Sequence, residues 1–459
     1  MVVVPRRSEA RSPRSPARRA GQDARRLVAV LALVLVAGGP PTALRAQAPE
    51  HRVFLPLLSP PLRRADRPLF SRTRGLQERP FALSLRAPDG LVIRYSLDGR
   101  APAPDLGLIY TAPIPVSHSL VVRALAYGPE GDLAPSAVET HSYVFPESVF
   151  RQPADPPGLP GDWGVGVEMP ELGPVAADYG MDPRVIDDPR YAPRLTKALR
   201  DLPSLMLTLD PEDLFGPERG IYRHATEEGP DWERPVSVEL IRADGRDGFQ
   251  VDAGLRMAGV ASRHHQFTRK HSFSLRFRSR YGSPRLDYPL FPDSPVARFD
   301  TLRLRAGFND SFAFVPWRGQ YLRDAWGRSS QRDMGGLAPR GRFTHLFLNG
   351  LYWGLYEATE EPTAAFSADH LGGREADYDV VKSAERGEEG VEDGNRLAYE
   401  RLIAMTDLAD PVHYRQVADL LDIDAFADYM LLNIYSLNLD WQTNWRAARS
   451  RVTGFGFRF

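Results

Sequence analysis

The chain of 459 residues contains no cysteine. Disulfide bonds, thiolate chemistry and cysteine-based zinc sites all require this residue, so we expect none of them, and stability must come from packing. The same absence excludes a lipoprotein anchor, which would be attached through a cysteine.

The chain also has almost no net charge. Its 58 lysines and arginines balance 59 aspartates and glutamates, which leaves a formal charge of -1. This balance gives no general attraction to nucleic acid or to an anionic membrane, so we expect no nucleic-acid partner. With 42% apolar residues, the chain can bury a substantial core, and its length favours two or three domains.

Long apolar runs are also missing, and no run can cross a bilayer core of about 30 Å. The short apolar run Leu27–Ala37 follows an arginine-rich segment and precedes the small-residue sequence at 46–48. This order is typical of a secretory signal peptide, so we predict cleavage after Ala48 and a secreted, periplasmic or cell-surface location without a transmembrane anchor. A start codon placed too far upstream is the alternative interpretation of the long basic segment.

Short alternating runs over residues 81–145 predict a small antiparallel β-sandwich. In SLVVRALAY, Leu120 and Val122 are expected to point inward, and Val121 and Arg123 outward. The sequences YSLDGRAP, YTAPIPV and VVRALAY resemble the GH29D-like β-sandwich module, also described as the chitobiase C-terminal domain. The resemblance implies an accessory module, to which no catalytic residue is assigned.

The pattern changes to mixed strands and helices beyond a linker rich in proline and glycine. Alternating sequences such as ERPVSVELI predict strands, and GQYLRDAWGRSSQRDMG and DAFADYMLLNIYSL have apolar residues at helical spacing. The Asn-Gly pair at 349–350 predicts a hairpin turn, the Asp-Pro pair at 410–411 a helix start, and Asp422 or Asp424 a cap for the last helix. Because the strands precede the longer helices, we expect an α+β domain.

A series of motifs follows one another from about residue 205 to the end of the chain. They are DPEDLFGPERGIY, WERPVSVELI, GLRMAGVASRHHQFTRKHSFSLRFRSRYGSPRLDYPLF, LRLRAGFNDSF, LRDAWGRSSQRDMG, FLNGLYWGLYEATEEP, DYDVVKS and NLDWQTNW. Together they resemble the CotH-like kinase family, named for a spore coat protein. The resemblance implies an atypical, protein-kinase-related fold that uses ATP with Mg²⁺ or Mn²⁺ to phosphorylate Ser or Thr of secreted proteins.

Two candidate nucleotide-binding residues come from this resemblance. Phosphoryl transfer needs a cation on the phosphates and an acid that holds the cation. Lys270 in RKHSFSLRF matches the family's lysine, and Glu360 matches the acid of its Glu-Arg-Pro sequence, which reads Glu360-Glu361-Pro362 here. An arginine is thus replaced by an acid. A strand-edge lysine and a surface carboxylate are the alternative interpretations.

The candidate catalytic loop is NLDWQTNW. Asp440 directly follows a predicted helix, and a carboxylate on an exposed loop there can accept the proton of a substrate hydroxyl. The family pattern, commonly D-W-x-x-N-N, implies a metal-binding asparagine, for which Asn444 is the candidate. Trp445 occupies the position of the second asparagine.

The family's next metal ligand is an aspartate in a Trp-Asp sequence, at the end of a strand that follows this loop. GFGFRF resembles the start of that strand and ends at Phe459. We therefore expect the chain as written to be inactive or a truncated reading of a longer protein, so that its status as an enzyme stays open. The predicted fold is multidomain, with a small all-β sandwich before an α+β atypical kinase-like domain that is truncated at its C-terminus. Its parts are a signal peptide (1–48), a linker (49–70), the β-sandwich (71–146), a Pro/Gly-rich linker (147–202) and the CotH-like kinase domain (203–459).

Other functions find less support in the sequence. His264, His265 and His271 are close together, but adjacent histidines on a strand point to opposite faces, and no HExxH sequence occurs. No G-x-S-x-G, P-loop or GxGxxG sequence is present, and no carboxylate pair stands in a recognisable glycosidase setting. The remaining alternative is a non-catalytic secreted scaffold that binds carbohydrate or other cell-surface material instead of a Ser/Thr-containing protein.

Overall fold

The computed structural model describes residues 62–459, except 132, 167–168, 243, 245–247, 313, 315–316, 386–387, 453 and 455, and it also leaves out the side chains of 384–385 and 388–389. The predicted signal peptide therefore lies outside the described residues. All that follows concerns these described residues, which belong to one compact unit. In this described part, no helix combines the length and apolar character needed to cross a membrane.

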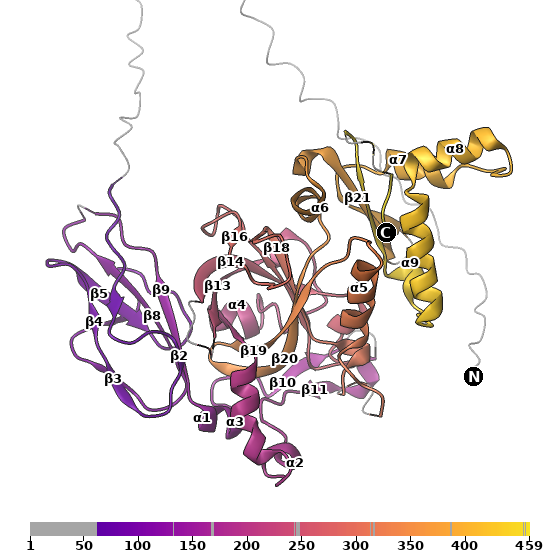
Figure 1. The fold of residues 1–459 in the computed structure, drawn as a ribbon. Helices are drawn as coiled ribbons and strands as arrows, with labels where there is room; N and C mark the ends of the chain where they lie inside the picture. The colour runs from indigo at the N-terminus through magenta and orange to yellow at the C-terminus, as the bar shows by residue number, and fades with distance from the viewer. Residues whose placement is uncertain are drawn as a thin grey trace, which may run out of the picture. The chain divides into compact units, whose positions relative to one another are not determined.

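Short strands form the first folded part (Figure 1). A five-stranded sheet has the order β2-β9-β8-β5-β6, and the pairs β1-β4 and β3-β7 accompany it. The bounds are β1 Leu69–Phe70, β2 Gly75–Leu76, β3 Phe81–Leu83, β4 Leu85–Arg86, β5 Val92–Ser96, β6 Leu108–Ile109, β7 Ile114–Val116, β8 Leu120–Tyr127 and β9 Glu139–Val144. Leu83, Ile114, Val122 and Tyr143 share one apolar core, so the alternating runs do pack as antiparallel layers.

The face of β8 expected to point outward is buried. Val121 and Arg123 lie outside the sandwich core that holds Val122, as expected, but they are not solvent-exposed, since Val121 is 3% and Arg123 is 7% exposed. A Cβ atom added to Gly350 would lie 3.3 Å from Val121 Cγ2, which shows that a turn of the following domain covers this face. Arg123 Nη1 donates to the carbonyl of Gly99 at 2.9 Å.

The Pro/Gly-rich segment is ordered against its neighbours. It contains α1 Pro146–Phe150, β10 Asp162–Val165, β11 Pro174–Ala176, α2 Pro183–Ile186 and α3 Ala192–Asp201. Trp163 and Tyr179 join the core of the next domain, where their rings contact Phe215. Gln152 fixes the start of the segment, because its side chain bonds both the N–H and the carbonyl of Tyr352.

A closed barrel follows, with the order β12-β13-β14-β15-β18-β20-β19. Its strands are β12 Ser204–Thr208, β13 Arg234–Ile241, β14 Phe249–Ala258, β15 Ser272–Arg276, β18 Thr301–Arg305, β19 Gly341–Leu348 and β20 Leu351–Glu360. Alternate side chains such as Leu255, Phe273 and Leu304 fill the interior. The predicted hairpin turn is confirmed, since Asn349 and Gly350 have φ angles of 48° and 85° between β19 and β20. The parallel pairing of β12 with β19 closes the barrel.

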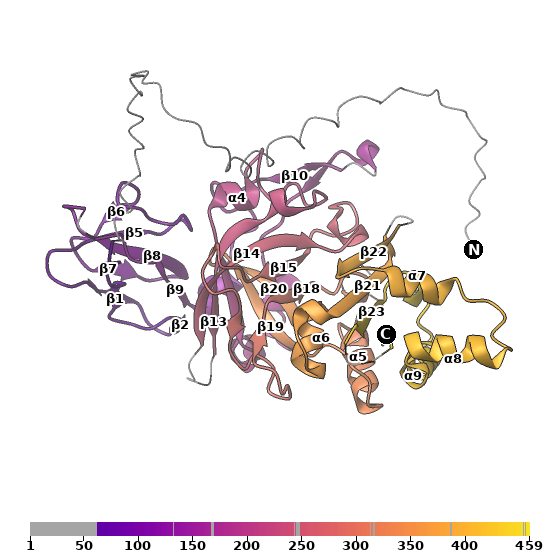
Figure 2. The same cartoon turned by 90° about the horizontal axis from the view of Figure 1, so that it is seen from above.

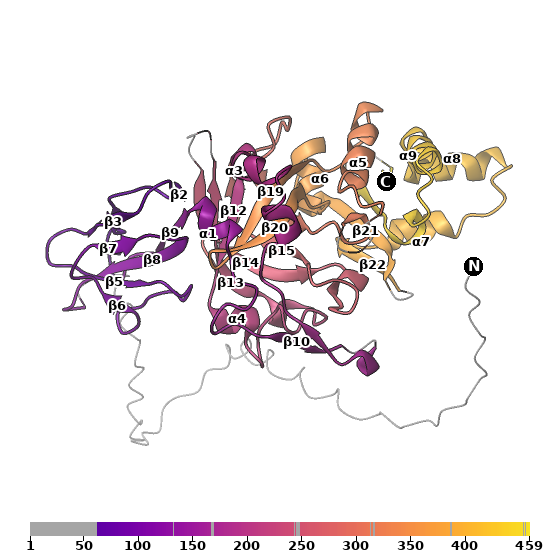
Figure 3. The same cartoon turned by 90° about the horizontal axis from the view of Figure 1, so that it is seen from below.

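Helices and a second sheet make up the C-terminal part. The sheet has the order β22-β21-β23, and Figures 2 and 3 show it between the barrel and the helices α7–α9. Asp410 caps α8 and Asp422 caps α9, which confirms the predicted starts and selects Asp422 over Asp424. The remaining bounds are α4 Pro211–Phe215, α5 Arg323–Asp333, α6 Ala364–Leu371, β21 Tyr378–Glu385, β22 Glu388–Asp393, α7 Leu397–Ile403, α8 Pro411–Leu420, α9 Ile423–Tyr435 and β23 Arg446–Ser450. The described residues are thus compatible with a multidomain, β-rich chain that ends in a mixed α and β part.

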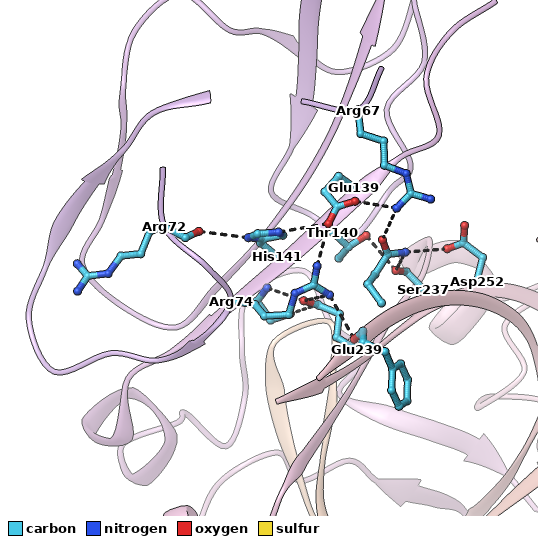
Figure 4. A network of polar contacts seen from close by, with 12 residues as sticks. Arg67, Arg72, Arg74, Glu139, Thr140, His141, Ser237, Glu239 and Asp252 are labelled. Carbon is cyan, nitrogen blue, oxygen red and sulfur yellow. Dashed lines mark hydrogen bonds and ion pairs between the residues drawn. The ribbon is translucent and has the colours of Figure 1, made fainter. Parts of the chain in front are cut away.

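A buried polar network joins β9 of the sandwich to β13 of the barrel (Figure 4). Glu239 is fully buried and accepts hydrogen bonds from the N–H, at 3.1 Å, and the hydroxyl of Ser142. Arg74 lies 3.3 Å from the same carboxylate, and Ser237 Oγ donates to Thr140 Oγ1 at 3.0 Å. Burial raises the pKa of Glu239 even though Arg74 and the Ser142 hydrogen bonds favour its charged form.

We expect Glu239→Ala to lower the free energy of unfolding by about 2–4 kcal/mol, because the buried donors of Ser142 lose their acceptor. Urea denaturation of the purified chain measures this loss. Glu78→Ala is the matched control, since Glu78 forms an exposed pair with Arg200 and its removal should cost less than about 1 kcal/mol. Equal losses in the two variants would show that the network does not stabilise the junction.

A buried and a half-buried histidine, His271 and His265, lie at one end of the barrel. His271 Nε2 and His265 Nδ1 are 2.8 Å apart, and His271 Nδ1 lies 2.7 Å from the carbonyl of Ser262. His264 and His265 follow a 3-10 turn, Ala261–Arg263, instead of lying on the expected strand. Burial lowers the pKa of His265 to about 4 and that of His271 to about 3. The described residues contain no cluster of three or more potential metal-ligating side chains.

The folded state keeps both imidazoles neutral, whereas the unfolded chain protonates them below about pH 6.5. Stability should therefore fall by roughly 2–4 kcal/mol as the pH drops from about 7 to 5. Denaturant titrations at several pH values measure the slope. The double variant His265→Gln/His271→Gln should show a shallower slope, whereas His118→Gln, at an exposed position, should keep that of the parent. A slope unchanged in the double variant would contradict the expectation.

Candidate functional site

The predicted catalytic loop is exposed and is anchored to the C-terminal sheet. Asp440 follows α9 and occupies the N-cap position of the 3-10 helix Trp441–Thr443. Thr443 Oγ1 donates to its carboxylate at 3.2 Å, and Asn444 Nδ2 donates to its carbonyl at 3.1 Å. Ser383 on β21 fixes the loop, because its hydroxyl donates to the carbonyl of Thr443 at 2.6 Å. The structure thus brings the Asp440 carboxylate and the Asn444 amide onto one loop.

Lys270 lies just before β15, and the residue is half-buried with its ammonium enclosed by the protein. Its Nζ donates to the carbonyl of Leu355 and lies 4.6 Å from the ring centroid of Tyr356 and 5.5 Å from that of Tyr321. Burial lowers the pKa of Lys270 to about 7. Among the described residues, no ion pair includes Lys270.

Glu360 ends β20 and has other partners. Its carboxylate accepts a hydrogen bond from the N–H of Arg340 at 2.7 Å and lies 2.8 Å from His370 Nε2. The structure therefore does not bring Lys270 and Glu360 together, because each has its own partners within the protein.

Glu361 joins the barrel to the C-terminal sheet, a role that the sequence interpretation did not assign to it. Arg303 Nε on β18 donates to Glu361 Oε2 at 2.8 Å, and Arg446 Nη2 on β23 lies 2.7 Å from Oε1. Burial alone would raise the pKa of Glu361, but Arg303 and Arg446 hold it well below the usual range for a carboxyl. Two features of the sequence could have indicated this role of Glu361. One is the acid in place of the family's arginine, and the other is Arg446 just after the loop.

The ion pairs continue along the outer face of the barrel and into β22. Glu392 lies 3.5 Å from Arg446 and 3.3 Å from Lys382. On the barrel, the strand register sets Ser274 opposite Arg256 on one side and opposite Arg303 on the other. These side chains point away from the core, and Arg303 reaches Glu361, so charged groups line the side of the barrel that meets the C-terminal sheet.

Glu233 gathers several arginines at one end of this face. Arg256 Nε is 2.6 Å from its carboxylate, Arg278 Nε is 3.5 Å away, and Arg280 also contacts it. Burial opposes its ionisation, but the arginines hold the pKa of Glu233 below its ordinary value. A Cβ atom at position 254 would lie 2.5 Å from Glu233 Oε1, so Gly254 leaves room for this carboxylate.

Residues 255–451 match the family model described as CotH kinase protein. This part of the chain is similar to a kinase. The matched range includes Lys270, Glu360, Glu361 and the Asp440 loop, and it ends just after β23. A comparison with curated proteins gave no match. The resemblance of the β-sandwich to a GH29D-like module remains a prediction.

We expect Glu361→Gln in the CotH-like part to lower the free energy of unfolding by roughly 2–4 kcal/mol, because Arg303 and Arg446 lose their shared counter-charge. Glu361→Arg, which introduces the residue found in the family, should cost more, since it places a third cation beside these two. Guanidinium denaturation measures both losses. Glu375→Gln removes an exposed partner of Arg285 and should cost less than about 1 kcal/mol. A loss in Glu361→Gln no greater than this control would contradict the assignment.

Proposed function

We propose that the protein is an exported CotH-like kinase that transfers phosphate from ATP, with Mg²⁺ or Mn²⁺, to Ser or Thr of exported proteins. The family match over residues 255–451 carries the proposal, because it covers the segment that presents Asp440 on an exposed loop. Export rests on the signal sequence and on the proposed cleavage after Ala48.

The chemistry of the Asp440 loop fits this reaction. Asp440 is exposed, so its carboxylate is accessible to a Ser or Thr hydroxyl and can accept its proton during transfer. The amide nitrogen of Asn444 already donates to the Asp440 carbonyl, which leaves the amide oxygen as a donor atom for a hard cation. When bound, Mg²⁺ or Mn²⁺ would neutralise the charge of the phosphates.

A second candidate function is that of a non-catalytic scaffold that binds carbohydrate or other cell-surface material. The buried state of Lys270 favours it, since its ammonium is bonded to a main-chain carbonyl and Glu360 is bonded to His370. A kinase that uses these two residues as the resemblance implies would have to break both contacts. Thermal-shift titrations with MgATP, together with retention on insoluble polysaccharide, separate the two functions. Retention without any nucleotide-induced shift would favour the scaffold.

If the chain transfers phosphate and Asp440 accepts the substrate proton, Asp440→Ala should lower the rate of transfer by about 10²–10⁴-fold with little change in stability. Incorporation of labelled phosphate from ATP into a Ser/Thr-rich protein acceptor measures this rate. Asp419→Ala, at an exposed position on α8, is the control and should keep the parent rate. Equal transfer by the Asp440 variant and the parent would remove Asp440 from the mechanism.

A further inference from the structure

Two buried polar groups on the outer face of β15 lack partners in the described part of the chain. They are the hydroxyl of Ser274 and the Nε of Arg276. The two residues are separated by one position on the strand, so they share a face, and Leu275 between them points into the core. A buried donor without an acceptor costs free energy, which a ligand carrying acceptor oxygens would recover.

The surroundings of these two groups are rich in positive charge. Ion pairs on this face and on the opposite sheet join cations to carboxylates. Among the residues that the structure describes, the cations of these pairs outnumber the carboxylates. The cations are Arg256, Arg278, Arg280, Arg303, Lys382 and Arg446, and the carboxylates are Glu233, Glu361 and Glu392. Arg276 adds a further cation, whose pKa is lowered by burial and by the neighbouring arginines. This face of the barrel thus carries an excess of positive charge, which suits a polyanion.

The same face is connected to the Asp440 loop. Asn444 ends this loop, and Arg446, two residues on, reaches Glu361 at the edge of the barrel. The opposite side of β15 faces the barrel interior, and Lys270 places its ammonium against Tyr356, a residue of that interior. Arg276 and Ser274 therefore lie on the side of β15 that faces the C-terminal sheet, whereas the ammonium of Lys270 does not.

We infer that the polyphosphate of the nucleotide binds on the outer face of β15, where Arg276 and Ser274 donate hydrogen bonds to phosphate oxygens. Guanidinium groups are well suited to this role, because they present several donors in a fixed plane to phosphate. The surrounding arginines contribute long-range attraction without leaving their carboxylate partners. The nucleotide as ligand rests on the proposed function, but the polyphosphate site rests on the contacts of this face.

Isothermal titration of the purified chain with ATP and, separately, with inorganic tripolyphosphate tests the inference. The parent should bind both, and Arg276→Gln should weaken both by about tenfold or more. Ser274→Ala should weaken both by a few-fold while keeping the thermal stability of the ligand-free chain, because it removes a hydroxyl that has no partner. Arg94→Gln is the matched control, since Arg94 is a half-buried strand arginine of the β-sandwich that also has an unpartnered Nε.

Two outcomes would overturn the inference. One is the absence of tripolyphosphate binding by the parent, and the other is a loss of affinity in Lys270→Met while Arg276→Gln keeps the parent affinity. Phosphate transfer, measured in parallel, separates this inference from the proposed function. Binding through Arg276 without transfer would contradict the proposed kinase activity and support the polyphosphate site. Transfer that is unaffected by Arg276→Gln would support the kinase activity and contradict the polyphosphate site.

Discussion

The buried carboxylate of Glu361 is the interaction on which the CotH-like part depends. It neutralises Arg303 from the barrel and Arg446 from the C-terminal sheet, which are distant in sequence. Removing two arginines from water is costly unless a carboxylate of good geometry accompanies them. The position of β23, and with it the loop that carries Asp440, therefore depends on one acid that stands where the family usually has an arginine.

Local features of this domain followed directly from the sequence. Alternation predicted the barrel strands, the Asn-Gly pair predicted the turn at 349–350, and Asp410 and Asp422 predicted two helix starts. Each of these depends on residues within a few positions, where backbone propensity and capping dominate. The Asp440 loop was also recognisable, because its residues are contiguous and its exposure follows from its polarity.

What the sequence could not predict depends on pairing between distant segments. The barrel closes through parallel pairing of β12 with β19, and alternation in either strand says nothing about its neighbour. The alternation in β8 predicted that Val121 points away from the sandwich core, but the pattern of one sheet does not reveal the second layer that buries it. For the same reason Lys270 and Glu360, assigned by resemblance, turned out to have separate partners. The order of the motifs along the chain indicates the family. The partners of each side chain, by contrast, are set by its neighbours in the folded structure.

The two candidate phosphate ligands differ in what binding would require of them. With a pKa near 7, Lys270 is only partly charged at neutral pH, and it would have to break its bond to Leu355 to reach a phosphate. Arg276 keeps its charge, because an arginine whose pKa is lowered by burial is still protonated at neutral pH, and its Nε has no bond to give up. A phosphate on the outer face of β15 thus adds a partner to a buried donor, whereas a phosphate at Lys270 replaces one. With the peripheral arginines already held by Glu233 and Glu361, the smaller reorganisation favours Arg276 as the group that meets the phosphate.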